Sequence, residues 1–232
     1  VTGISEWYPA LGEFSFPTVF LELAEEERRA LIEQDDACKT TRDLSARLQK
    51  AIRSLGGAGF IGTDVCAPTD SPKYRHGRWV SFGRTAWRVL AGSHKARAAL
   101  SQAETRLLTV RPWRRMDRAR EFRLFVHQRK LAAISQLHLD RYLPGIAQRE
   151  REILGKTRRF LETVAERLPE DNLVMDVYLT AEGELMLVDI NDWGPPTDPL
   201  LLRKWDRDWT TSASLVLVPE PVRMGGDISI SF

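Results

Sequence analysis

Apolar residues near the C-terminal end gather in two short runs, residues 173–179 and residues 184–191. Both runs have the β-branched and apolar content that is typical of buried strands. The Glu182-Gly183 step between them suits a tight connection. The pattern therefore predicts a β-hairpin.

A third strand is predicted by the strict alternation of Glu121-Phe-Arg-Leu-Phe-Val126. Because side chains alternate across a strand, Glu121 and Arg123 should lie on one face, and Phe122 and Leu124 on the other. One face of this strand is therefore expected to be polar and the other to be buried.

Helical spacing of apolar positions is clearest at residues 43–55, where leucine and isoleucine recur every three to four residues before the Gly56-Gly57 step ends the pattern. Further helices are expected at residues 25–34, 93–104 and 149–168. The segment 68–77 is rich in Pro, Asp, Ser and Gly and is expected to be a mobile loop.

Charge is distributed in two opposed blocks, although the 232-residue chain has a net charge of only +2. Residues 106–130 contain nine Lys or Arg against two acidic residues, a formal +7. Residues 169–199 contain eight Asp or Glu and no Lys or Arg, a formal −8. A basic strand face opposite an acidic one fits a polyphosphate with its metal ion, since arginine binds phosphate oxygens bidentately. The alternative is a pair of complementary solvated faces, which we expect for residues 114–120.

Oxygen ligands for a metal ion converge if the hairpin is correct. Asp176 lies in its first strand, and Asp189 and Asn191, two residues apart, point to one side of the second. Magnesium binds such hard ligands together with the phosphates of a nucleotide. The alternative is that these polar residues simply end the strands.

Eight short segments, taken in order, resemble the cell division cycle protein 123 family: Trp7-Tyr-Pro9, Ser54-Leu-Gly-Gly57, Val110-Arg-Pro-Trp113, 121–126, Leu131-Ala-Ala-Ile-Ser-Gln136, Val174-Met-Asp-Val-Tyr178, Leu187-Val-Asp-Ile-Asn191 and Thr197-Asp-Pro-Leu-Leu201. The resemblance implies an ATP-grasp-like α+β fold with ATP and magnesium between two lobes, which we expect at residues 1–108 and 109–232. Eukaryotic members are chaperones that assemble translation initiation factor two. Prokaryotic relatives have been proposed to be ATP-dependent ligases, and we expect this chain to be such a relative.

The family pattern also implies site residues. It places the metal at Asp176, Asp189 and Asn191, a phosphate on Arg123, and adenine against the hinge segment 109–113. The implied nucleotide-binding residues are Arg111, Pro112, Trp113, Glu121, Arg123 and Lys73. Lys73 enters as a substitute, because Gly62 and Thr69 stand where relatives have cations for the phosphates.

Other chemistries have no support in the sequence. The glycines at 56, 57 and 59 lack the Gly-Lys-Ser/Thr of a P-loop. Cys38 and Cys66 are far apart, so we expect free thiols rather than a zinc site or a disulfide. With neither a membrane-spanning run nor a signal peptide, a cytoplasmic protein is expected.

Two functions remain open at this point. The first is a nucleotide-dependent assembly or binding protein for a translation-related partner. The second is an ATP-dependent ligase that acts on RNA or on a small carboxylate or phosphate substrate. The arginine-rich block would attract an acidic protein or an RNA backbone alike.

Overall fold

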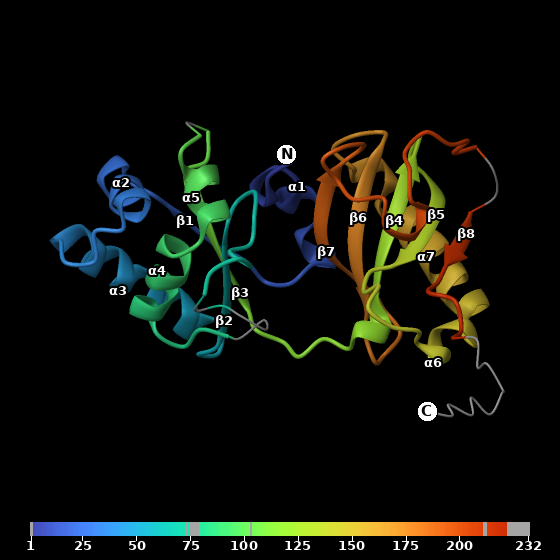
Figure 1. Cartoon of the computed structure of the whole chain (residues 1–232), viewed down its shortest axis with the longest axis horizontal. Coiled ribbons are helices and arrows are strands. Elements are labelled where there is room, and N and C mark those ends of the chain that lie inside the picture. The colour runs from blue at the N-terminus through green and yellow to red at the C-terminus, as the bar shows by residue number, and fades with distance from the viewer. Residues whose placement is uncertain (1, 73, 75–78, 103, 211–212, 222–232) are drawn as a thin grey trace, which may run out of the picture.

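The computed structural model describes residues 2–72, 74, 79–102, 104–210 and 213–221. Two lobes lie side by side, with the N-terminal helix α1 between them (Figure 1). The first lobe holds a three-stranded antiparallel sheet in the order β1-β3-β2. Its elements are β1 (Val19–Glu22), α2 (Glu25–Glu33), α3 (Lys39–Ser54), β2 (Gly59–Thr63), α4 (Gly83–Ala91), α5 (His94–Leu100) and β3 (Leu107–Pro112).

The second lobe is built on a five-stranded sheet in the order β7-β6-β4-β5-β8, which is antiparallel except for the pair β5–β8. Helix α7 packs on this sheet. The elements are β4 (Glu121–His127), β5 (Lys130–Gln136), α6 (Pro144–Ala147), α7 (Glu150–Val164), β6 (Leu173–Leu179), β7 (Leu185–Asp192) and β8 (Ser214–Val216).

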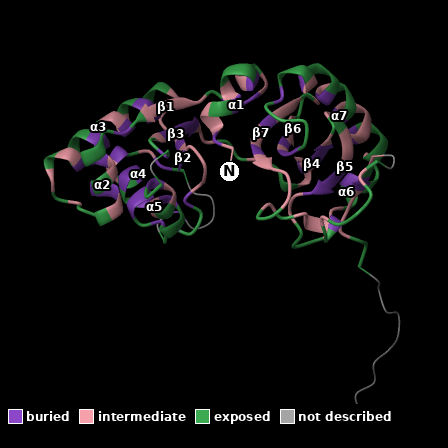
Figure 2. Ribbon diagram, turned by 90° about the horizontal axis from the view of Figure 1, so that it is seen from above, coloured by how far each residue is buried: buried purple, intermediate pink, exposed green. Residues whose placement is uncertain are grey.

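Each lobe has its own hydrophobic core, visible as buried segments at the centre of each half in Figure 2. The core of the first lobe is formed by residues 23–110, mainly from α3, α4 and the small sheet. The core of the second lobe includes Trp7 and Leu11 of α1 (Ile4–Leu11), which are 1% and 0% exposed. The N-terminal helix therefore packs with the second lobe, although the chain then continues into the first.

The expected hairpin is confirmed, because β6 and β7 pair antiparallel with Asp176 opposite Asp189. The alternation of the third predicted strand is also confirmed, since Phe122 and Leu124 of β4 are buried in the core of the second lobe. The pattern at residues 43–55 corresponds to α3, which begins earlier, with Cys38 as its N-cap. Gly56 and Gly57 end this helix with φ angles of 95° and 85°, values that favour glycine.

Several elements were not predicted from the sequence, among them α1, β1, α4, α6 and β8. The expected lobe boundary after residue 108 falls inside β3, whose residues 107–112 pair with both β1 and β2. We propose instead to divide the lobes after β3. Within the described part of the chain, no helix is both long and apolar enough to cross a membrane.

Candidate functional site

Two adjoining cavities lie where the lobes meet. One has a volume of about 190 Å³ and the other about 160 Å³. They share Phe60 of β2, Arg111 of β3 and Val188 of β7. Both lobes therefore contribute walls to two cavities that adjoin at these residues.

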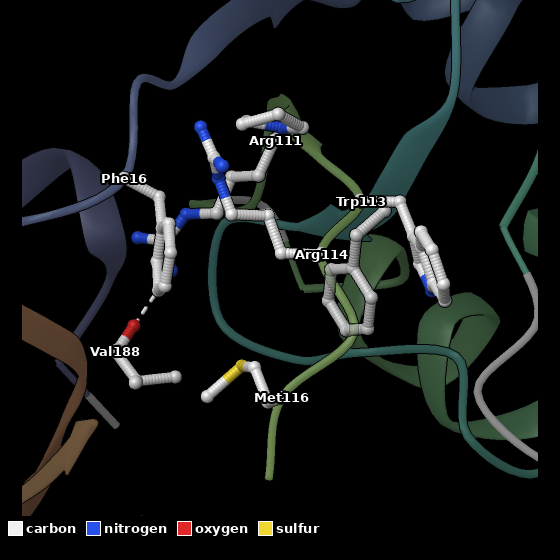
Figure 3. A pocket seen from close by; sticks show the side chains of 8 residues that line it. Phe16, Arg111, Trp113, Arg114, Met116 and Val188 are labelled. Atoms are coloured by element: carbon white, nitrogen blue, oxygen red, sulfur yellow. Dashed lines mark hydrogen bonds between the residues drawn. The ribbon is translucent and has the colours of Figure 1, made fainter. Parts of the chain in front are cut away.

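The larger cavity is mainly apolar and is lined by Phe16, Phe60, Arg111, Pro112, Trp113, Arg114, Met116 and Val188. Figure 3 shows Arg111 reaching toward Val188, with Met116 of the interlobe linker close by. The backbone N–H of Trp113 donates to the carbonyl of Ala58 at 2.9 Å, and Pro112 has no N–H. The cavity thus suits a flat apolar group held by packing rather than by hydrogen bonds from these two residues.

Arg111 connects the two cavities and is only 8% exposed. Its Nε donates to Thr18 Oγ1 at 3.1 Å and its Nη1 to the carbonyl oxygen of Val188 at 2.6 Å. Nη2 is buried without a hydrogen-bond partner among the described residues. Burial lowers the pKa of Arg111, and the nearby carboxyl of Asp189 opposes that shift. A buried donor without a partner is unfavourable. An anionic oxygen from a ligand would accept a hydrogen bond from Nη2 and so satisfy this donor.

The smaller cavity has more polar side chains in its walls than the larger one, and we call it the polar cavity; they include Thr63, Asp64, Cys66, Thr109, Asp176 and Asp189. Arg123 of β4 forms a bidentate ion pair with Asp176, with Nε and Nη2 at 2.7 and 2.8 Å from the two carboxylate oxygens. Its Nη1 also donates to the carbonyl of Asp198 at 2.9 Å. Asn191 Nδ2 lies 3.5 Å from Asp176 Oδ2. Asp176 therefore contacts two other predicted site residues, Arg123 and Asn191.

Asp189 lies opposite Asp176 in the β6–β7 pairing and is only partly exposed to solvent. Burial, followed by repulsion from the charge of Asp176, raises the pKa of Asp189 to about 7, although Arg111 opposes this shift. The carboxyl groups of Asp176 and Asp189 therefore repel each other when both are ionised. A cation between them would relieve that repulsion.

Magnesium fits these donors by their chemistry, since two carboxylates and an amide oxygen are ligands that it prefers. Among the described residues, no three His, Cys, Asp or Glu side chains form a metal-binding group. The three ligands predicted from the sequence include an amide, Asn191, and one of the two carboxylates, that of Asp176, is already paired with Arg123. The metal site therefore remains a proposal that rests on donor type and on the repulsion between Asp176 and Asp189.

Three of the predicted site residues, Glu121, Arg123 and Asn191, line neither cavity. The carboxylate of Glu121 lies 3.0 Å from His138 Nε2. Lys73 lies outside the described residues. Sequence reasoning also missed several cavity walls, namely Ile4, Phe16, Phe60, Thr63, Asp64, Cys66, Met116 and Val188.

Comparison with solved structures identifies the class of fold. The chain matches the structure of Cdc123 from Schizosaccharomyces pombe with a TM-score of 0.82 and 20% identity, over 94% of this chain and 96% of the other. It also matches the ADP complex of N5-carboxyaminoimidazole ribonucleotide synthetase with a TM-score of 0.52 and 13% identity, over 90% and 49% of the two chains. The fold is ATP-grasp-like α+β, as expected.

Sequence comparison gives the family. The D123 family model matches residues 88–209, more than half of the chain, and the chain belongs to this family. A relative from Xenopus tropicalis, a translation initiation factor eIF2 assembly protein, is 24% identical over 90% of this chain and 78% of its own length. The corresponding protein from Dictyostelium discoideum is 26% identical, over 80% and 50%. These relatives are eukaryotic, so the expectation of a prokaryotic relative is not borne out.

The raised pKa of Asp189 predicts a pH dependence of stability. Because the folded protein holds this proton up to about pH 7 and the unfolded chain releases it near the ordinary value of 3.8, the contribution of Asp189 to stability should decrease as the pH rises from 4 to 7. The free energy of unfolding of wild type relative to Asp189→Asn should therefore fall with rising pH, by at most about 1.4 kcal/mol per pH unit. Urea unfolding of both proteins with a metal chelator present measures this difference. A difference that does not change with pH would contradict the prediction.

Proposed function

We propose that this protein binds ATP with magnesium between its lobes and acts as an assembly protein for a translation factor. The observation that carries the nucleotide part is the junction at Arg111, where an apolar cavity meets a polar one beside an unpaired arginine nitrogen. The assembly part is supported by the names of the relatives from Xenopus and Dictyostelium.

In this proposal the base occupies the apolar cavity beside Phe60 and Met116, and the phosphates extend past Arg111 into the polar cavity. Nη2 of Arg111 donates to a phosphate oxygen. Asp176, Asp189 and Asn191 hold the magnesium ion, which supplies positive charge for the phosphates. Arg123 fixes the orientation of the Asp176 carboxylate through its two hydrogen bonds.

Nucleotide binding would also link the two lobes. Arg111 belongs to β3 of the first lobe and donates to Val188 in β7 of the second, so a ligand on Arg111 contacts both sides of the junction. A partner that binds across both lobes would then bind better to the nucleotide-loaded protein, because the loaded state holds one interlobe arrangement. This gives a physical basis for nucleotide-dependent assembly.

Mg-ATP should raise the thermal midpoint, whereas ATP with a chelator should raise it little. At about 100 times its dissociation constant, the ligand should add about 2.7 kcal/mol to stability. Asp189→Ala should abolish the metal-dependent part, because it removes a carboxylate that faces Asp176. Differential scanning fluorimetry measures the effect, with Asp206→Ala, an exposed carboxylate outside both cavities, as the matched control.

Equal stabilisation with and without metal would argue against the magnesium site.

The same variants test the assembly function. Wild type with Mg-ATP should retain purified initiation factor two subunits on a column without releasing ADP, and Asp189→Ala should retain less. Steady ADP release coupled to an acceptor, without capture of a subunit, would instead favour the ligase.

A further inference from the structure

A second pair of cavities lies between α7 and the turn that joins β4 to β5. Their volumes are about 280 and 430 Å³, and they share Lys130, Leu131 and Arg158. Figure 1 shows α7 lying beside this edge of the large sheet, next to β5 and β8. No residue of this groove lines either nucleotide cavity. We call it the α7 groove.

The α7 groove is basic. It is lined by His127, Arg129, Lys130 and Arg158, with Glu162 as the one acidic residue among the lining residues. Arg129 is already engaged, since its Nε donates to Asp171 at 2.7 Å and its Nη1 to the carbonyl of Ala165 at 2.5 Å. Lys130 and Arg158 are exposed, and neither side chain forms a hydrogen bond or ion pair with the residues that the structure describes. Two cations are therefore available to a ligand.

The turn that presents Lys130 is held in a defined geometry. Gln128 and Arg129 have left-handed φ angles of 51° and 58°. The backbone N–H of Gln128 donates to Asn172 Oδ1 and that of Arg129 to the carbonyl of Asp171, both at 2.8 Å. Because the turn is tied to the segment before β6, binding requires little ordering of the backbone at this point.

Apolar groups also line the groove, among them Leu131, Ala132, Leu161, Trp209 and Ala213. Trp209 does not offer a free face for stacking. Its ring packs against Phe125 at 5.5 Å and Trp193 at 4.6 Å, and the guanidinium of Arg207 lies 5.1 Å from its centroid. Single-stranded nucleic acids rely on bases stacking on exposed aromatic rings, so the groove is less suited to them than to a polypeptide.

We propose that the α7 groove binds an acidic segment of a protein partner in which carboxylates alternate with apolar side chains. Carboxylates pair with Lys130 and Arg158, and apolar side chains pack on Leu131 and Leu161. Charge complementarity of this kind determines which partner binds and how fast it associates. This interaction is separate from nucleotide binding, so either can fail without the other.

The test uses a labelled twelve-residue peptide of alternating Glu and Leu, with a twelve-nucleotide RNA as the competing class. The peptide should shift the amide NMR signals of Lys130, Leu131 and Arg158, and it should bind more weakly as salt increases. Lys130→Glu with Arg158→Glu should weaken peptide binding by about tenfold or more. The matched control, Arg151→Glu with Arg159→Glu, makes an equal change of charge on α7, the helix that contains Arg158, at positions outside the groove and should change binding less than about twofold.

If the double reversal perturbs the fold by circular dichroism, Lys130→Gln with Arg158→Gln replaces it. The proposal is overturned if millimolar peptide leaves these NMR signals unmoved, or if the control pair loses as much affinity as the groove pair. It is also overturned if the RNA binds the groove more tightly than the peptide does. Mg-ATP stabilisation of the groove variant should equal that of wild type, which separates this result from a failure of the nucleotide site.

Discussion

Replacing Arg123 with alanine is expected to weaken both the fold and the binding of Mg-ATP. The Arg123 and Asp176 side chains are only 12% and 13% exposed, so the substitution leaves a carboxylate that is poorly hydrated and has lost two charged hydrogen bonds. We expect a loss of about 3 kcal/mol in the free energy of unfolding. Mg-ATP binding should weaken by about 1.5–3 kcal/mol, because the carboxylate is no longer held toward the cavity. Urea unfolding and titration calorimetry measure the two effects.

Arg118→Ala is the matched control for this experiment. Arg118 also pairs with an aspartate, since its Nη1 lies 2.9 Å from Asp140, but these two side chains are 51% and 56% exposed. An exposed ion pair of this kind contributes about 0–1 kcal/mol, and it lies outside both cavities. Equal losses in the two variants would show that the Arg123–Asp176 pair has no special part in the fold or in the site.

The sequence predicted the face on which Arg123 and Asp176 lie, but not that they bind each other. The period of two in residues 121–126 determines which side chains share a face. The pairing of Arg123 with Asp176 depends on the register between β4 and β6, which are separated by about fifty residues and by α7. Local alternation carries no information on that register, so the sequence indicated two separate ligands where the structure has one ion pair.

The walls of the cavities were missed for a similar reason. Phe16, Phe60, Met116 and Val188 come from four separate segments and each looks like an ordinary core or loop residue. Only the folded arrangement places them around Arg111. Asp176 and Asp189 were singled out because carboxylates in buried strands are unusual, and both line the smaller cavity.

Helix α4 shows how a glycine can mislead. Gly83 begins this helix, and glycine is usually read as a helix breaker. Here an added Cβ would overlap the carbonyl oxygen of Ser45, so glycine allows α4 to pack closely against α3. The residue serves a contact between helices, which sequence patterns do not report.

Gly62 is a similar case, and it leads to a prediction opposite to the one that the family pattern favours. The family resemblance implies a cation at this position, so that Gly62→Lys would be expected to restore a phosphate contact. In the structure Gly62 is buried in β2, and an added Cβ would lie 2.9 Å from the carbonyl oxygen of Cys66. That carbonyl accepts hydrogen bonds from the backbone N–H of Thr63 at 3.0 Å and from its hydroxyl at 3.2 Å, so it has little freedom to move.

We therefore expect Gly62→Lys to destabilise the protein by about 3 kcal/mol without tightening ATP binding, since overpacking a fixed backbone contact forces the strand to shift. Gly62→Ala, which adds only the Cβ, should account for about 1–3 kcal/mol of this loss. Thr69→Lys is the control, because Thr69 is exposed and its Oγ1 already lies 3.4 Å from Lys95 Nζ, so stability should change little. Unfolding midpoints and ATP affinity measured on the same proteins test this prediction. A Gly62→Lys protein that is as stable as wild type and binds ATP more tightly would contradict it, and would show that the backbone at Cys66 can move and that the cavity lacks only a positive charge.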